Sequence, residues 1–278
     1  MPVSHPLVPE IDARLGDPFE KQVLEAAMHS LEQSTNPLRL NNFATTLREL
    51  SRLVLHRLAP DAEVKACAWY VKPTGPTDLT RGQRITYAVQ AGLLDSFITN
   101  TLLLDVDKMR QELVQTISTL SKYTHIHPSV FGVTGPALDV IFSESLEAFL
   151  AFLEMIQECR ESIEHAVESY ACDALNEEFI RTARHELDEL ATHHTVYGAL
   201  VDTVTLRTMD ATQLRFSMTG SVECQLQYGS SGDVRNGDGL VMDDSYPLAC
   251  EFEASTATPL QLSLKSHTLK IDTDSFYE

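Results

Sequence analysis

The period of the apolar residues changes once along this chain, near residue 195, and this change restricts the possible folds more than any other feature. Up to about residue 193, apolar residues recur at steps of three and four, the period of a helix with one buried face. From Val196 onward, apolar and polar residues alternate, as in strands that bury one face. We therefore predict an α+β protein with a helical N-terminal domain followed by an antiparallel β module.

The same pattern predicts the domain boundaries and the helices. Residues 1–18 contain four prolines and are expected to form a loose N-terminal arm. The helical domain should then span 19–195 and the β module 196–278. Within the helical domain, periodicity and turn residues predict six helices, at 19–34, 39–58, 81–94, 105–122, 138–175 and 177–193. The segment 61–80 should be rich in loops, and the long helix is expected to break near Ser169 or Cys172.

Composition excludes several classes of protein. No run of about 18 apolar residues is present, so no membrane-spanning helix is expected. The N-terminal residues are acidic and lack the basic and apolar regions of a signal peptide. The five cysteines are odd in number, widely spaced and without a C-x-x-C pair. This argues against a zinc site or a disulfide framework, and we expect a cytoplasmic protein without metal or other cofactor.

Charge is distributed unevenly along a chain whose net charge is −19. Residues 39–122 contain eleven Lys or Arg and eight Asp or Glu, whereas residues 142–190 contain three and thirteen. An anion site is therefore expected in the first segment. The second segment should face solvent or bind a basic protein partner.

The first candidate site lies on the helix predicted at 39–58. Arg48, Arg52 and His56 follow one another at steps of four, beside the apolar face, so they share one side of the helix. An imidazole can move a proton, and guanidiniums can stabilise charge on a phosphate that is being cleaved. We predict these three residues to be catalytic for RNA cleavage without a metal ion. The alternative is a polar helix face that only supports neighbouring carbonyls and carboxylates.

Two further pairs of residues are candidates. Arg81 and Arg84 lie at the start of a helix that Thr80 is expected to cap, where they would bind nucleic acid. The alternative there is an ordinary capped helix with exposed arginines. Arg160 and His165 match the R-x4-H signature of the helical HEPN ribonucleases, in which Arg and His act together, often across a dimer. They are an alternative catalytic pair, although the surrounding glutamates repel phosphate and also fit a solvated acidic helix.

Metal-binding patterns are incomplete. His125 and His127 form an H-x-H pair, and three residues on the last predicted helix share one face, namely His185, Glu189 and His193. Loop histidines and a polar helix face explain these residues without a metal. In the β module, Glu251 and Glu253 supply two acids of a metal-dependent nuclease, but the lysine that normally follows them is missing.

Several stretches of the chain resemble the predicted nucleases that associate with prokaryotic PIWI (pPIWI) proteins. They are LNNFATTLRELSRLVLHRLAPD, TRGQRITYAVQAGL, LSKYTHIHP, LDELATHHTV, GSVECQLQYGSSGDVRNGDG and DSYPLACEFEA, and they span about residues 38–254. The resemblance implies a protein of bacterial defence against phages and mobile elements that acts on nucleic acid within a complex. The missing lysine argues against metal-dependent DNA cleavage, so RNA is the expected substrate.

The expected partners follow from these hypotheses. We expect RNA rather than DNA, a protein partner of the defence complex that carries basic residues, and a homodimer as a further assembly. No membrane partner is expected. The rival hypothesis is a non-enzymatic scaffold, whose acidic helix docks a basic partner and whose β module presents a strand edge.

Overall fold

The computed structural model describes residues 5–186, 193–265 and 268–272, and for most of 173–199 it describes the backbone alone. It divides the chain into two compact units. The first, here the helical unit, contains the residues up to Ala91 together with Leu103–Ile163. The second, here the sheet unit, contains Gly92–Leu102 and the residues from Glu164 onward. The chain thus enters the sheet unit twice. The predicted α+β class is confirmed, and the predicted boundaries at 18 and 195 stay predictions.

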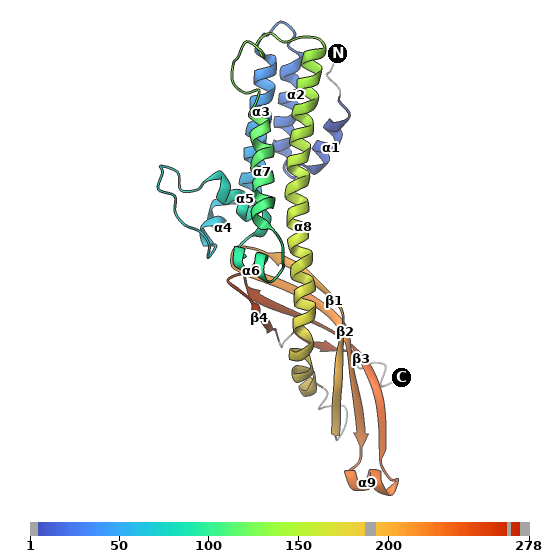
Figure 1. Cartoon of the computed structure of the whole chain (residues 1–278). Coiled ribbons are helices and arrows are strands. Elements are labelled where there is room, and N and C mark those ends of the chain that lie inside the picture. Colours follow the sequence, from blue (N-terminus) through green and yellow to red (C-terminus); the bar gives the residue numbers. More distant parts are fainter. Residues whose placement is uncertain (1–4, 187–192, 266–267, 273–278) are drawn as a thin grey trace. The chain divides into compact units, whose positions relative to one another are not determined.

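The helical unit is a bundle in which α2, α3 and α7 run alongside the first part of α8 (Figure 1). Its helices are α1 (Leu7–Arg14), α2 (Pro18–Glu32), α3 (Arg39–Leu58), α4 (Asp61–Ala66), α5 (Arg81–Gln90), α7 (Val106–Leu120) and the first part of α8 (Pro136–Glu186). Periodic apolar positions explain the bundle, because Phe43, Leu47 and Leu50 on α3 are fully buried. Phe149 and Phe152 of α8 are buried as well. Among the described residues, no helix has the length and apolarity needed to cross a membrane.

Three local predictions differ from the structure. The segment predicted as a loose arm contains α1, whose Ile11 is fully buried, before Asp17 caps α2 and Pro18 occupies its first turn. The helix predicted over 81–94 ends at Gln90, and a separate short helix, α6 (Asp95–Asn100), follows. The break predicted near Ser169 or Cys172 is absent, because α8 continues to Glu186.

The sheet unit is antiparallel, with the strand order β1-β2-β3-β4 and with β5 paired to β3. Its elements are α6, the second part of α8, β1 (His193–Met209), β2 (Gln213–Tyr228), α9 (Ser231–Asn236), β3 (Leu240–Ser255), β4 (Thr258–Leu264) and β5 (Lys270–Ile271). Burial alternates along β2, as the sequence predicts. Phe216 and Phe252 are register partners on the buried face, with ring centroids 4.8 Å apart. One face of the sheet therefore forms the core of this unit.

Gly92 begins the first passage of the chain through the sheet unit. Its backbone N–H donates to the Asp210 carbonyl at 3.1 Å, at the turn between β1 and β2. A Cβ at this position would lie 1.9 Å from the carbonyl oxygen of Ala211. The Thr256 hydroxyl donates to the same oxygen at 2.9 Å. Only glycine permits this close approach between two backbone segments.

Candidate functional site

Four of the predicted site residues line one pocket of the helical unit. The pocket has a volume of about 590 Å³ and lies where α3 ends, α4 and α5 begin, and the loop before α5 returns. Arg52 and His56 reach it from α3, and Arg81 and Arg84 reach it from α5. The complete lining is Arg52, Leu55, His56, Asp61, Pro76, Thr77, Asp78, Leu79, Arg81 and Arg84. Below, it is called the arginine pocket.

Arg84 joins three helices at the base of the arginine pocket. Its side chain is only 10% exposed, and its guanidinium donates at 2.6 Å to the Ala59 carbonyl and at 2.6 Å to the Asp61 carboxylate. It thereby satisfies a carbonyl at the end of α3 and fixes the first residue of α4. The hydrogen bond from Arg84 holds the pKa of Asp61 below its usual value. Asp61 is therefore an ionised carboxylate near neutral pH.

His56 lies beside these charges and is biased toward its neutral form. Partial burial lowers the pKa of His56 from its ordinary value of 6.5, and the positive charges of Arg84 and Arg52 lower it further, against the opposing effect of Asp61. At neutral pH the imidazole is thus predominantly uncharged. A neutral imidazole can accept a proton from a bound substrate.

Arg48 and Arg52 share the carboxylate of Glu49, but they do not share the pocket. Arg52 Nε lies 2.8 Å and Arg48 Nη2 lies 3.2 Å from Glu49. The hydrogen bond from Arg52 is the largest of the effects that lower the pKa of Glu49. Arg52 is 54% exposed and lines the arginine pocket, whereas Arg48 does not. Of the three residues predicted on α3, the structure therefore brings Arg52 and His56 to one pocket and leaves Arg48 outside its lining.

Arg81 is the most available cation of the pocket. It is exposed and, within the described part of the chain, makes no ion pair. Thr80 caps this helix as expected, and Gln83 completes a capping box with it, because Gln83 N–H donates to Thr80 Oγ1 at 3.1 Å. The predicted helix cap is confirmed, and Arg81 is left free to contact a ligand. Arg84 is mainly occupied with protein partners, although it still lines the pocket.

Part of the lining is a loop held by Asp78. Lys65 and Lys72 lie 3.0 and 3.4 Å from the Asp78 carboxylate, and the Tyr70 hydroxyl donates to the Asp78 carbonyl at 2.9 Å. Lys65 and Lys72 together lower the pKa of Asp78. Sequence periodicity did not identify Asp61 or Asp78 as part of the site, because both lie outside the helix face that it follows. The position of Asp61 directly after Ala59-Pro60, at a helix start, was the only local signal.

The alternative pair does not join this pocket. Arg160 and His165 both lie on α8, and a separation of five residues places them roughly 140° apart around the helix axis. Arg160 belongs to the helical unit and His165, which is exposed, belongs to the sheet unit. Their proposed role stays a prediction.

Among the described residues, no group of three His, Cys, Asp or Glu side chains is placed to hold a metal ion. His185, Glu189 and His193 lie outside the described side chains. His125 is exposed, and the ring of His127 hydrogen-bonds to the Ser129 hydroxyl at 3.0 Å. In the sheet unit, Lys265 Nζ lies 2.8 Å from the carboxylate of Glu253, so a lysine is present beside this acid in space although not in sequence. The two residues form an ordinary ion pair, and Glu251 is exposed beside them.

Comparison with known proteins identifies a family for this chain. Two family models match the chain, at residues 12–149 and 156–277, and both are described as predicted pPIWI-associating nucleases. Comparisons with curated proteins and with solved structures find no match.

Proposed function

Because the chain belongs to the family of predicted pPIWI-associating nucleases, we propose that it is a nuclease that cleaves RNA without a metal ion in the arginine pocket. One observation carries the proposal. A histidine whose pKa is lowered faces the same pocket as Arg52, Arg81 and Arg84. This combination supplies a proton acceptor and positive charge without metal ligands. The association with a pPIWI protein in the family description supports a role in prokaryotic defence, which we place in the cytoplasm.

The proposed reaction is an internal transesterification. The neutral imidazole of His56 accepts the proton of a ribose 2′-hydroxyl, and the 2′-oxygen attacks the adjacent phosphorus. The bond from phosphorus to the 5′-oxygen breaks, and the departing 5′-oxygen receives a proton from water. The resulting hydroxide takes the proton from His56 and restores the neutral imidazole. The products are a 2′,3′-cyclic phosphate and a 5′-hydroxyl end. Arg52 and Arg81 stabilise the additional negative charge on the phosphate oxygens during the attack.

The size of the pocket favours an unpaired substrate. A volume of about 590 Å³ is that of a small-ligand site, so it suits one nucleotide and excludes a paired helix. Pro76 and Leu79 give the lining an apolar part against which a base can stack, and the arginines supply the part that suits a phosphate. Single-stranded RNA is therefore the proposed substrate.

A cleavage assay with the wild-type protein tests this function directly. Single-stranded RNA and DNA of the same sequence are incubated with it in EDTA, and the ends of the products are identified. RNA is expected to be cut, with cyclic phosphate ends, and DNA is expected to stay intact because it lacks the 2′-hydroxyl. Loss of cleavage in EDTA, or equal cleavage of DNA, would contradict the proposal.

The pH profile of RNA cleavage provides a second prediction. A base acts only when deprotonated, so the rate should be lost as pH falls through the pKa of His56, with a midpoint below 6.5. Arg52→Gln removes one of the charges that lower this pKa and should move the midpoint upward. Rates of RNA cleavage in EDTA, measured from acidic to neutral pH, check both statements. A midpoint above 6.5 in the wild type would contradict them.

A second candidate function is a non-enzymatic scaffold, and the acidic face of α8 favours it. Glu158 and Glu161 are exposed there, whereas Glu154 binds Arg14 at 2.9 Å. This face suits a basic protein partner, and a homodimer is a further proposed assembly. Absence of cleavage of any nucleic acid by the wild-type protein would favour this function over the nuclease.

A further inference from the structure

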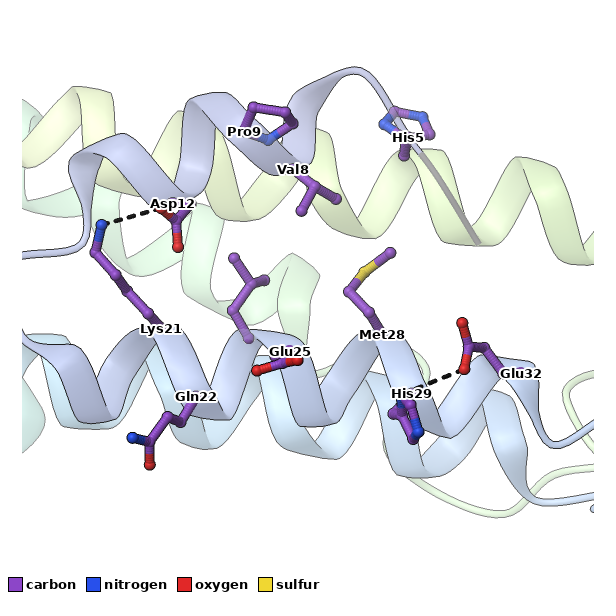
Figure 2. A pocket seen from close by; sticks show the side chains of 11 residues that line it. His5, Val8, Pro9, Asp12, Lys21, Gln22, Glu25, Met28, His29 and Glu32 are labelled. Carbon is purple, nitrogen blue, oxygen red and sulfur yellow. Dashed lines mark hydrogen bonds and ion pairs between the residues drawn. The ribbon is translucent and has the colours of Figure 1, made fainter. Parts of the chain in front are cut away.

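A second pocket of the helical unit lies between α1 and α2 and differs from the arginine pocket in character (Figure 2). Its volume is about 790 Å³. Val8 extends into it from α1, and Met28 extends toward Val8 from α2 (Figure 2). Leu24 and Pro9 add to the apolar lining. Below, this pocket is called the α1–α2 groove.

Carboxylates surround this apolar lining. Asp12 and Lys21 form an ion pair of 3.0 Å toward one end of the groove, and His29 and Glu32 lie 3.3 Å apart toward the other (Figure 2). Glu25, between them, is exposed and makes no ion pair among the described residues. The lining contains three carboxylates, Asp12, Glu25 and Glu32, and one ammonium, Lys21, so the acidic side chains outnumber the lysine. A phosphate is repelled here, whereas an ammonium or guanidinium is attracted.

The groove is a built feature, because α1 is fixed at several points. Ile11 is fully buried in the bundle. Arg14 binds both Glu10 and Glu154, at 3.1 and 2.9 Å. The His5 ring is within hydrogen-bonding distance of the Ser143 hydroxyl, at 3.1 Å. These contacts hold α1 against α8 while its Val8 side faces the groove.

We propose that the α1–α2 groove binds a basic amphipathic helix of a protein partner. One apolar side chain of the partner inserts between Val8 and Met28, and a Lys or Arg on its flank pairs with Glu25. The eight residues of α1 span about 12 Å, which corresponds to two turns of a partner helix. Such a helix presents apolar residues at i, i+3, i+4 and i+7, the pattern that grooves between helices bind. Methionine lends itself to such surfaces because its flexible side chain adapts to the inserted residue.

A labelled peptide tests the proposal on the full-length protein. The probe is a short helical peptide with leucines along one face and lysines on both flanks, and its fluorescence anisotropy is measured during titration. A scrambled peptide of the same composition controls for charge, because its leucines no longer share a face. The protein is expected to bind the amphipathic probe at least about tenfold more tightly than the scrambled one.

Three variants localise the binding. Glu25→Lys and Met28→Gln are each expected to weaken binding of the probe about tenfold. Glu25→Lys removes the proposed ion pair with a lysine of the probe, and Met28→Gln removes the apolar contact with one of its leucines. Glu112→Lys makes the same charge change on an exposed position of α7 in the same unit, outside the groove, and should leave binding within about twofold. Thermal unfolding followed by circular dichroism verifies that each variant is folded. Glu25→Lys should also keep the RNA cleavage of the wild type, which separates this proposal from the nuclease proposal.

The contrary outcomes are distinct. Equal binding of the two peptides, or an equal loss with Glu112→Lys, would mean that the net charge of the chain alone attracts the probe, and would overturn the proposal. Binding of a small apolar amine at the groove without binding of the peptide would overturn it as well, since the occupant would then be a small molecule.

Discussion

His56→Ala is expected to lower the kcat of RNA cleavage by about 10²–10⁴-fold, the usual contribution of a general acid or base. The structure gives the reason. The imidazole faces the arginine pocket in its neutral form, because burial and the charges of Arg84 and Arg52 lower its pKa. In the proposed mechanism it is the group that accepts the 2′-hydroxyl proton, and water is a much weaker base. Single-turnover cleavage of a short RNA in EDTA measures the effect.

A matched control separates catalysis from folding. His125→Ala removes another histidine of the helical unit, whose side chain is exposed outside the arginine pocket, and should leave the rate unchanged. The His56→Ala variant should still bind RNA with nearly the affinity of the wild type, since the arginines are intact. If both variants cut RNA as fast as the wild type, His56 is not the base. If His56→Ala loses RNA binding in proportion to cleavage, the residue acts in binding instead.

Gly92→Ala is expected to lower the free energy of unfolding by about 3 kcal/mol, at the upper end of the usual cost of overpacking. The added Cβ would lie 1.9 Å from the Ala211 carbonyl oxygen and 2.6 Å from Thr256 Oγ1. The first of these atoms belongs to the backbone, so a side-chain rotation cannot relieve the clash. The segment 92–102 would have to leave its place against the turn between β1 and β2, losing the hydrogen bond of Gly92 to Asp210.

The same substitution ten residues earlier is the control. At Gly82, on α5, the nearest atom to an added Cβ is 3.8 Å away, and alanine favours the helix, so Gly82→Ala should stabilise the protein by up to about 1 kcal/mol. Urea unfolding followed by circular dichroism compares both variants with the wild type. Equal stability of Gly92→Ala and the wild type would show that the close approach at Ala211 is absent in solution.

Periodicity was sufficient to predict the fold class and part of the candidate site. Arg52 and His56 are four residues apart, so helix geometry alone places them side by side, and the structure brings both to one pocket. The different surroundings of Arg81 and Arg84 depend on tertiary contacts. Arg84 is buried because its guanidinium binds the Ala59 carbonyl and the Asp61 carboxylate, 25 and 23 residues earlier in the chain, and no local pattern around Arg84 encodes these contacts.

The remaining differences between prediction and structure have the same origin. Prolines near the N-terminus suggested a loose arm, but Ile11 finds a place in the bundle core and stabilises α1. The helix from Arg81 ends early because Gly92 docks against the distant turn at Asp210. Asp78 enters the site through Lys65 and Lys72, which reach it across a loop.

The sheet unit is built from two separate stretches of the chain, Gly92–Leu102 and the residues from Glu164 onward, and this limits how its gene can be divided or recombined. A break between the two family-matched segments, after residue 149 and before residue 156, assigns Gly92–Leu102 to the first product and β1–β5 to the second. The second product would then lack Phe97, whose ring packs at 5.8 Å against Tyr170 of α8. An exchange of the C-terminal segment between relatives therefore has to match an eleven-residue stretch encoded far upstream. The two segments are expected to be inherited together as one gene.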